Sequence, residues 1–304
     1  MIEFIEHSKI DKAKWDDRIS HSFHRNIYGN SWYLDMVCPG WNALVEGDYH
    51  TIMPLTWKKK YGISYLYQPY FTQQLGIYGD KDISIEKTNE LLNAIPEQYR
   101  FIEINLNINN HIDDNRYETK KLPTYLLDLN QDYKKLYAGY SDNLKRNLVK
   151  ATKQGLSTKN DSGIEEIIRL FRENRGKEVS NLKDIHYNLL RKLINTVGEK
   201  GVLNKIGVYN MEGALLAGAF FLNHNHQTVF LFSGLSEQGK QNGAMAYLID
   251  SFIKSHAGQD LVLDFEGSVN PNLARFYKSF GSSQQEYPNI QRNLLPRPIK
   301  WLKR

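Results

Sequence analysis

Two carboxylates and a lysine in the last fifth of the chain have types and a spacing that suit acid–base chemistry. Asp264 and Glu266 alternate with apolar residues, so a strand there would place both carboxylates on one face. Lys278 follows on a segment with helical apolar spacing that Pro271 opens and Gly281 ends. A carboxylate can accept a proton from an amine, and an ammonium group can stabilise an oxyanion.

The same three residues also fit a purely structural interpretation. A salt bridge between Lys278 and Asp264 or Glu266 would need no chemistry at all. The sequence does not distinguish which of the two carboxylates would act as the base.

The motif that carries these residues resembles a known family. The run Asp264-Phe-Glu-Gly-Ser268, a short helix, and then Tyr277-Lys-Ser-Phe-Gly281 is similar to the second domain of FemAB-like acyltransferases, a branch of the GNAT (acyl-CoA N-acyltransferase) superfamily. The family ending commonly reads Phe-Lys-x-x-Phe-Gly, so this chain changes the aromatic residue and shortens the spacing by one. The resemblance implies that Lys278 contacts a phosphate of the donor or the oxyanion.

A glycine-rich loop precedes the next expected helix and is the candidate donor site. In GNAT domains the acyl donor lies between the fourth and fifth strands, with its phosphates at a helix N-terminus, where free N–H groups favour an anion. The stretch 233–243 occupies that position, but its Lys240-Gln-Asn-Gly-Ala-Met245 only approximates the superfamily signature. The expected donor-binding residues are Ser233, Gly234, Gly239, Lys240, Asn242 and Gly243.

Two further segments are expected to contact the substrate. A basic stripe that includes Arg146 runs along a helix that Ser141 caps and Gly155 ends, and this helix resembles the one that opens the second FemAB-like domain. Most such stripes are simply solvated. In the first half, an aromatic-rich stretch at 68–76 matches the acceptor groove by resemblance, although such strands are more often core. The expected substrate-binding residues are Tyr70, Gln73, Gln74, Tyr140, Arg146 and Tyr277.

The composition is that of a globular protein with a mild positive charge. The 39 Lys and Arg residues against 34 Asp and Glu residues give a net charge of +5, which permits an anionic ligand without implying nucleic acid. The single cysteine, Cys38, cannot form an internal disulfide. We expect no metal site, no membrane span and no secretion signal, and therefore a cytoplasmic protein.

Element patterning predicts an α+β protein of tandem GNAT-like domains, each with a mixed, mainly antiparallel sheet flanked by helices. The second half has the order helix, helix, three-strand meander, helix, strand, helix, strand, which by resemblance is that of a GNAT domain. The expected domains are 1–130, a degenerate copy on the acceptor side, and 131–304, the donor and catalytic side.

The predicted function is transfer of an acyl or aminoacyl group from an activated donor to an amine, which could belong to a cell-envelope precursor. Acyl-CoA, such as acetyl-CoA, is the favoured cosubstrate, and no tightly bound cofactor is expected. Aminoacyl-tRNA is less favoured because the long helical insertion of the tRNA-dependent relatives is missing. A catalytically silent ligand-binding protein of the same fold is the alternative, and an RNA-binding protein ranks last.

Overall fold

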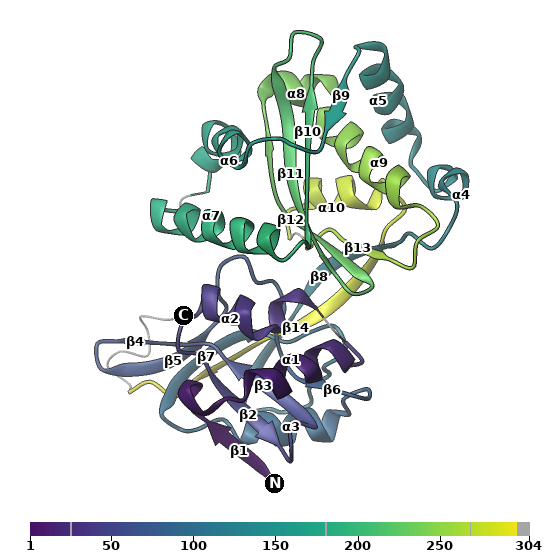
Figure 1. Ribbon diagram of the computed structural model, residues 1–304. Coiled ribbons are helices and arrows are strands. Elements are labelled where there is room, and N and C mark those ends of the chain that lie inside the picture. Colours follow the sequence, from purple (N-terminus) through teal and green to yellow (C-terminus); the bar gives the residue numbers. More distant parts are fainter. Residues whose placement is uncertain (25, 180, 268, 297–304) are drawn as a thin grey trace. The chain divides into compact units, whose positions relative to one another are not determined.

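A computed structural model describes residues 1–24, 26–179, 181–267 and 269–296 (Figure 1). The chain divides into two compact units, one of Met1–Pro123 together with the chain from Glu286 onward, and one of Thr124–Gln285. Strands β8 (Glu118–Asp128) and β14 (Ser283–Asn293) each contain one of these boundaries. The sequence-based division had a single boundary at 130/131, because linear patterning does not reveal that the last strand returns to the first unit.

The first unit contains two sets of paired strands and three α-helices. One set has the order β1-β2-β3-β6, and in the other β4, β5, β7 and β14 are successive neighbours, with β5 and β7 parallel. The bounds are β1 (Ile2–Ile5), α1 (Lys12–His21), α2 (Ser31–Val37), β2 (Asn42–Glu46), β3 (Thr51–Leu55), β4 (Trp57–Lys60), β5 (Ile63–Tyr67), β6 (Tyr78–Gly79), α3 (Ile85–Asn93) and β7 (Tyr99–Asn105).

The elements expected in the first half are largely confirmed. Ser84 caps α3 by accepting a hydrogen bond from the Lys87 N–H at 3.2 Å, and the buried side chains of Leu91 and Leu92 pack it into the core. The extended chain is interrupted at Thr56, so residues 51–60 form β3 and β4 in two different sheets. Helices α1 and α2 were not expected, since α1 is mostly polar and α2 has only seven residues.

The second unit is one mixed sheet with helices on both faces. Its strand order is β8-β13-β12-β11-β10-β9, and every pair is antiparallel except β12 and β13. The bounds are α4 (Tyr133–Ala138), α5 (Asp142–Lys153), β9 (Ser157–Lys159), α6 (Ile164–Glu173), η3 (Arg175–Lys177), α7 (Asp184–Glu199), β10 (Leu203–Tyr209), β11 (Leu215–His224), β12 (Gln227–Leu235), α8 (Glu237–Asn242), α9 (Ala244–His256), β13 (Val262–Asp264) and α10 (Pro271–Lys278).

The expected element order of this unit is confirmed, with local corrections: helix α4 and strand β9 were not expected. Helix α6 begins after Gly163, whose N–H donates a hydrogen bond to Glu166, while the Ser162 hydroxyl accepts one from Tyr209. The loop expected at 233–243 contains the short helix α8. Strand β13 ends at Asp264, so the alternation does not continue to Glu266.

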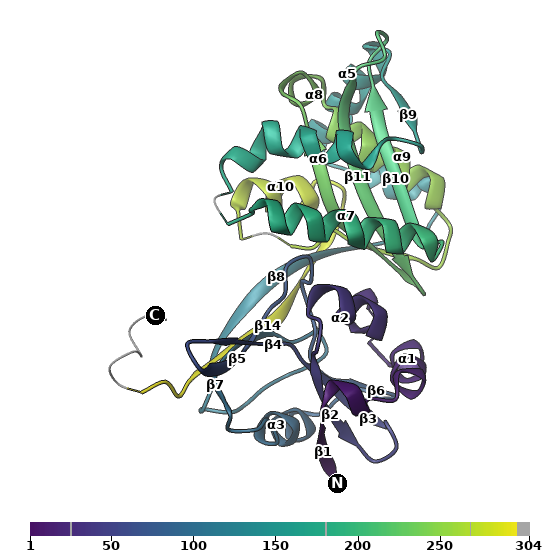
Figure 2. The ribbon, with the colours of Figure 1, turned by 60° about the vertical axis from the view of Figure 1, so that its left-hand side comes forward.

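Helix α6 and the Ser162 residue before it lie on a row of three glycines. Gly207 of β10, Gly218 of β11 and Gly234 of β12 are direct neighbours in the sheet register. A Cβ atom on Gly234 would lie 2.4 Å from the carbonyl oxygen of Ile167, and one on Gly218 would lie 2.4 Å from the Cγ1 of the same residue. Figure 2 shows α6 and α7 on one face of the sheet. The glycines therefore let the backbone of α6 approach the sheet closely.

A β-bulge in β12 sends its phenylalanines to opposite faces of the sheet. Phe230 pairs with Phe221 and Phe232 with Phe220, which leaves Leu231 as the extra residue. Phe230 accordingly joins the core on the α9 side, where Phe221 stacks on Phe252 at a centroid distance of 4.0 Å. The ring of Phe232 lies 4.7 Å from that of Phe171 on α6.

Candidate acyl-donor site

The site forms where β12 and β13 separate. The two strands pair over only three residues each, Gln227–Val229 and Val262–Asp264, and β12 then continues to Leu235 without this neighbour. The Asp264 carboxylate accepts a hydrogen bond from the Glu266 N–H at 2.8 Å, and Glu266 has a φ of 51°. This local turn ends β13 and leads the chain away from β12, which leaves the edge of β12 open.

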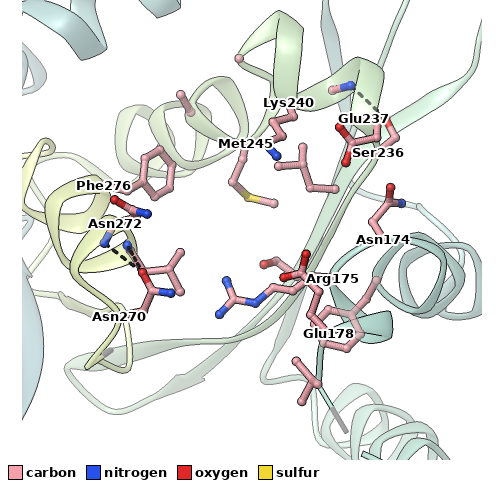
Figure 3. A pocket seen from close by; sticks show the side chains of 18 of the residues that line it. Asn174, Arg175, Glu178, Ser236, Glu237, Lys240, Met245, Asn270, Asn272 and Phe276 are labelled. Carbon is pink, nitrogen blue, oxygen red and sulfur yellow. Dashed lines mark hydrogen bonds between the residues drawn. The ribbon is translucent and has the colours of Figure 1, made fainter.

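A cavity of about 890 Å³ occupies this opening (Figure 3). Its walls come from the end of α6 with the following turn, from β12, from α8 with the start of α9, and from α10. The lining residues are Asn147, Phe171, Glu173, Asn174, Arg175, Lys177, Glu178, Val179, Phe230, Ser233, Leu235, Ser236, Glu237, Gly239, Lys240, Gly243, Met245, Ala246, Asn270, Asn272, Leu273, Phe276 and Tyr277.

Four of the six expected donor-binding residues lie in this cavity, namely Ser233, Gly239, Lys240 and Gly243. Gly234 and Asn242 are not among the lining residues; Gly234 faces α6 because consecutive strand residues point to opposite sides. Gly239 must lack a side chain, since a Cβ atom would lie 2.3 Å from the carbonyl oxygen of Leu216.

Gly243 joins α8 to α9 and brings the start of α9 to the cavity. Its φ of 72° is in the left-handed region, which favours glycine. Met245 and Ala246, in the first turn of this 13-residue helix, line the cavity. The helix dipole therefore adds positive potential beside Lys240 on the same wall.

Arg175 is the principal residue of the cavity that the sequence analysis missed. Figure 3 shows Arg175 and Lys240 extending toward the cavity from different walls. Among the residues that the structure describes, the Arg175 guanidinium makes no ion pair or side-chain hydrogen bond. Arg175 stands among other charged residues in the run 173–178, as is usual in a solvated turn. The sequence therefore offered no signal for it beyond Gly176 and the end of α6.

The expected catalytic residues occupy three different environments. Asp264 is buried, with 1% of its surface exposed, and burial raises the pKa of its carboxyl to about 6. It accepts hydrogen bonds from the Thr124 hydroxyl at 2.7 Å and from the Gln227 amide at 3.1 Å, in addition to the Glu266 N–H. Asp264 does not line the cavity, and its contacts tie β13 to β8 and β12.

Lys278 and Glu266 also lie outside the cavity lining. Lys278 is exposed, and its Nζ lies 5.6 Å above the centre of the Tyr125 ring. The salt-bridge alternative is not realised, because within the described ranges Lys278 forms no ion pair with Asp264 or Glu266. Glu266 is half-buried, and its charge, together with burial, raises the pKa of Tyr277. The roles proposed for these residues stay predictions.

Of the expected substrate-binding residues in the second unit, only Tyr277 lines the cavity. Its ring stacks on that of Phe265 at 5.0 Å, and burial raises the pKa of its hydroxyl to about 12, so it is a neutral wall of the site. Tyr140 is buried with its ring 5.5 Å from that of Phe280. Arg146 is exposed on α5, next to the lining residue Asn147.

The other expected substrate-binding residues, Tyr70, Gln73 and Gln74, belong to a loop of the first unit. Gln74 is buried, donates a hydrogen bond to the Gln73 side chain at 2.8 Å and accepts one from the Ile108 N–H at 3.1 Å. These bonds give Gln74 a structural role in holding the loop. Tyr70 is partly exposed, with its ring against that of Phe71.

The described residues contain neither a metal-binding cluster nor a membrane-spanning helix. No group of three or more His, Cys, Asp or Glu side chains there has the arrangement of a metal site. None of the helices in the same ranges combines the length and the apolar character that crossing a bilayer requires.

Comparison with solved structures shows that the chain has the fold of acyltransferases. FemX is similar with a TM-score of 0.67 and 13% identity over 99% of both chains. A tandem GNAT protein from the clavulanic acid biosynthesis pathway has a TM-score of 0.55 and 12% identity, covering 97% of this chain and 99% of its own.

The C-terminal domain of a putative lysylphosphatidylglycerol synthetase from Agrobacterium fabrum has a TM-score of 0.54 and 11% identity over 96% of this chain and 94% of its own. No family model and no curated protein matches the sequence. The resemblance to FemAB-like and tandem GNAT proteins is therefore confirmed for the fold.

A pH experiment tests whether burial raises the pKa of the Asp264 carboxyl in the folded protein. Because the pKa of this carboxyl is higher in the folded protein than its usual 3.8, the folded state binds more protons between pH 4 and pH 6. Asp264 therefore contributes less stability as the pH rises, by at most about 1.4 kcal/mol per pH unit. The free energy of unfolding of Asp264→Asn, measured by urea denaturation, should be furthest below that of wild type near pH 4. The difference should become smaller toward pH 7. A difference that stays constant across this range would contradict the assignment.

Proposed function

We propose that the protein is an N-acyltransferase whose second unit binds an activated acyl donor in the cavity beside β12. The observation that carries the proposal is the separation of β12 from β13 after three paired residues, with the cavity lying directly in the opening. Lys240 and the N-terminus of α9 supply positive potential for the phosphates of a donor. Phe230, Leu235 and Met245 supply apolar surface for the rest of it.

The reaction would join the acyl group to an amine. The amine nitrogen attacks the carbonyl carbon, a C–N bond forms, the bond to the leaving group breaks, and the amine proton passes to a base. Among the expected catalytic residues, Glu266 is the better candidate for this base, because both oxygens of Asp264 already accept hydrogen bonds. Lys278 remains the proposed cation for the donor phosphate or the oxyanion, on the strength of the sequence resemblance.

Acyl-CoA is the favoured donor. The fold is shared with a tandem GNAT protein whose own description refers to AcCoA, and the volume of the cavity is within the range of small-molecule sites. Aminoacyl-tRNA is the second donor to test. The acceptor is an amine, for which a cell-envelope precursor is the class that the resemblance favours.

Calorimetric titration with acetyl-CoA and longer acyl-CoAs tests the donor site. We expect saturable binding that Lys240→Ala weakens by about tenfold, which is the usual effect of removing a hydrogen bond to a charged group. Lys192 of α7 is exposed and does not line the cavity, so Lys192→Ala is the matched control and should bind like wild type. Equal loss in both variants, or no binding to any acyl-CoA, would contradict the assignment and move the test to aminoacyl-tRNA.

The alternative, a ligand-binding protein without catalysis, is separated from an enzyme by a second variant. If the protein is an enzyme, Lys278→Ala should keep its fold, as measured by circular dichroism, and lose amide formation with an amine acceptor. If wild type binds acyl-CoA but forms no amide with any amine of the screen, the silent alternative is favoured.

A further inference from the structure

The β4–β5 hairpin of the first unit concentrates unpaired positive charge. Lys58, Lys59 and Lys60 are all exposed on β4, and the turn that follows begins with Tyr61, which is 90% exposed with a φ of 52°. Because β4 has one strand neighbour, β5, the lysines protect an open edge from pairing, which is their ordinary role. Protection of the edge alone would not require the exposed Tyr61 at the turn or further unpaired cations beside the lysines.

The lysines of this hairpin differ from most others in the first unit. Six lysines of that unit are within 4.0 Å of a carboxylate: Lys9, Lys12, Lys14, Lys87, Lys120 and Lys121. Within the described part of the chain, Lys58, Lys59 and Lys60 have no such partner. Lys58 instead lies over the Tyr67 ring at 4.3 Å and Lys60 over the Tyr61 ring at 5.3 Å.

The end of the described chain reaches the same hairpin. Leu294 donates its N–H to the Arg100 carbonyl at 2.8 Å, and Leu294, Pro296 and Arg100 line a hollow of about 550 Å³ with residues 62–64 of the hairpin. Arg100 adds a fourth cation without an ion pair among the residues described. Figure 1 shows β4, β5 and β7 together in the first unit.

The sequence after Pro296 is also basic. Residues 297–304 read Arg-Pro-Ile-Lys-Trp-Leu-Lys-Arg, with four basic residues, no acid, and Ile299, Trp301 and Leu302 between them. Bases interleaved with tryptophan and aliphatic residues are typical of segments that bind the interface of an anionic membrane. The acids on β7 and the turn before it are Glu103 and Glu97, and neither pairs with these bases within the described residues.

We propose that the open edge of the hairpin, with Lys58 and Lys60 on one face of β4, Lys59 on the other, and Tyr61 and Arg100 beside them, binds the anionic surface of a lipid bilayer; these five residues are named here the hairpin patch. The lysines would lie against acidic headgroups, and Tyr61 at the projecting turn would enter the headgroup layer, where aromatic rings are favoured. A nucleic acid fits less well, because single strands bind in grooves with several open aromatic faces, whereas Lys58 covers the Tyr67 ring.

Vesicle co-sedimentation of the full chain tests the proposal. Wild type should sediment with vesicles of equal parts phosphatidylcholine and phosphatidylglycerol, should not sediment with pure phosphatidylcholine, and should dissociate as salt is raised. Replacing the three lysines of β4 by alanine should weaken binding by on the order of a hundredfold, since each lysine near an anionic surface contributes about fivefold.

The matched control removes the same charge elsewhere. Lys81, Lys134 and Lys192 are exposed and form no ion pair in the described ranges, so their triple replacement by alanine should retain at least most of the binding. Tyr61→Asn, which suits the left-handed backbone, should weaken binding by a smaller factor that depends little on salt.

Three outcomes would overturn the proposal: no sedimentation with anionic vesicles at low salt, an equal loss in the control triple variant, or binding to added RNA with none to the vesicles. The last would assign the hairpin patch to nucleic acid instead. Circular dichroism of each variant confirms that the fold is retained, so a loss of binding can be assigned to the surface.

Discussion

Gly234→Ala is expected to lower the free energy of unfolding of the second unit by about 3 kcal/mol. The new Cβ would lie 2.4 Å from the Ile167 carbonyl oxygen and 2.9 Å from the Phe171 nitrogen, both backbone atoms of α6 that cannot rotate away. Helix α6 would have to lift from the sheet. Because Phe171 and the turn after it line the cavity, acyl-donor binding should weaken as well.

The tryptophans allow this effect to be located. Trp15, Trp32, Trp41, Trp57 and Trp301 all lie outside residues 124–285, so tryptophan fluorescence reports the first unit, whereas far-ultraviolet circular dichroism reports both. In urea the dichroism transition of Gly234→Ala should move to lower concentration.

The matched control is Gly198→Ala in α7. Its Cβ would meet only Leu203 at an ordinary 3.6 Å, and alanine is the better helix former, so the variant should be neutral or slightly stabilised. Equal stability of Gly234→Ala and wild type would show that α6 does not depend on the glycine row.

Phe252→Ala is expected to lower the free energy of unfolding of the second unit by about 3–5 kcal/mol. Phe252 is fully buried on α9, and its ring is stacked between those of Phe221 at 4.0 Å and His256 at 4.1 Å. Removing the ring leaves a void between α9 and the sheet that these two neighbours cannot fill without moving the helix.

Urea denaturation followed by circular dichroism measures the loss. Phe23 is 60% exposed, so Phe23→Ala should change stability by no more than about 0.5 kcal/mol and controls for removal of a phenyl ring. A Phe252→Ala variant that unfolds at the wild-type urea concentration would mean that α9 contributes little to the core of this unit.

Local signals in the sequence predicted the parts of the fold that depend on local physics. Ser141 caps α5 by accepting from the Leu144 N–H, and Asn270 caps α10 by accepting from the Asn272 N–H, both as expected from residue type. Those elements give the GNAT-like order of the second unit.

Features that depend on which strands are neighbours could not be predicted. Gly207, Gly218 and Gly234 are far apart in sequence, and only the sheet register makes them a single row under α6. Gly234 was therefore taken for a donor residue, although it packs against a helix. Asp264 was expected to accept a proton or to pair with Lys278, whereas Thr124 and Gln227, distant in sequence, donate hydrogen bonds to its oxygens.

Only the part of the candidate site that is contiguous in sequence could be predicted. Lys240 and Gly243 could be recognised because loop, helix start and glycine are contiguous. Arg175 reaches the cavity only through the placement of α6 on the sheet, which no local pattern encodes.

The order in which the ribosome releases the chain has a consequence for biogenesis. The sheet of the first unit is completed by pairing of Asn289–Asn293 in β14 with Phe101–Asn105 in β7. The segment 124–285 is continuous, so it can fold as soon as it emerges, whereas the first 123 residues must wait for a strand translated after residue 285. Until β14 is made, the unpaired edge of β7 is open to aggregation. The second unit would therefore fold before the first, although it is synthesised later.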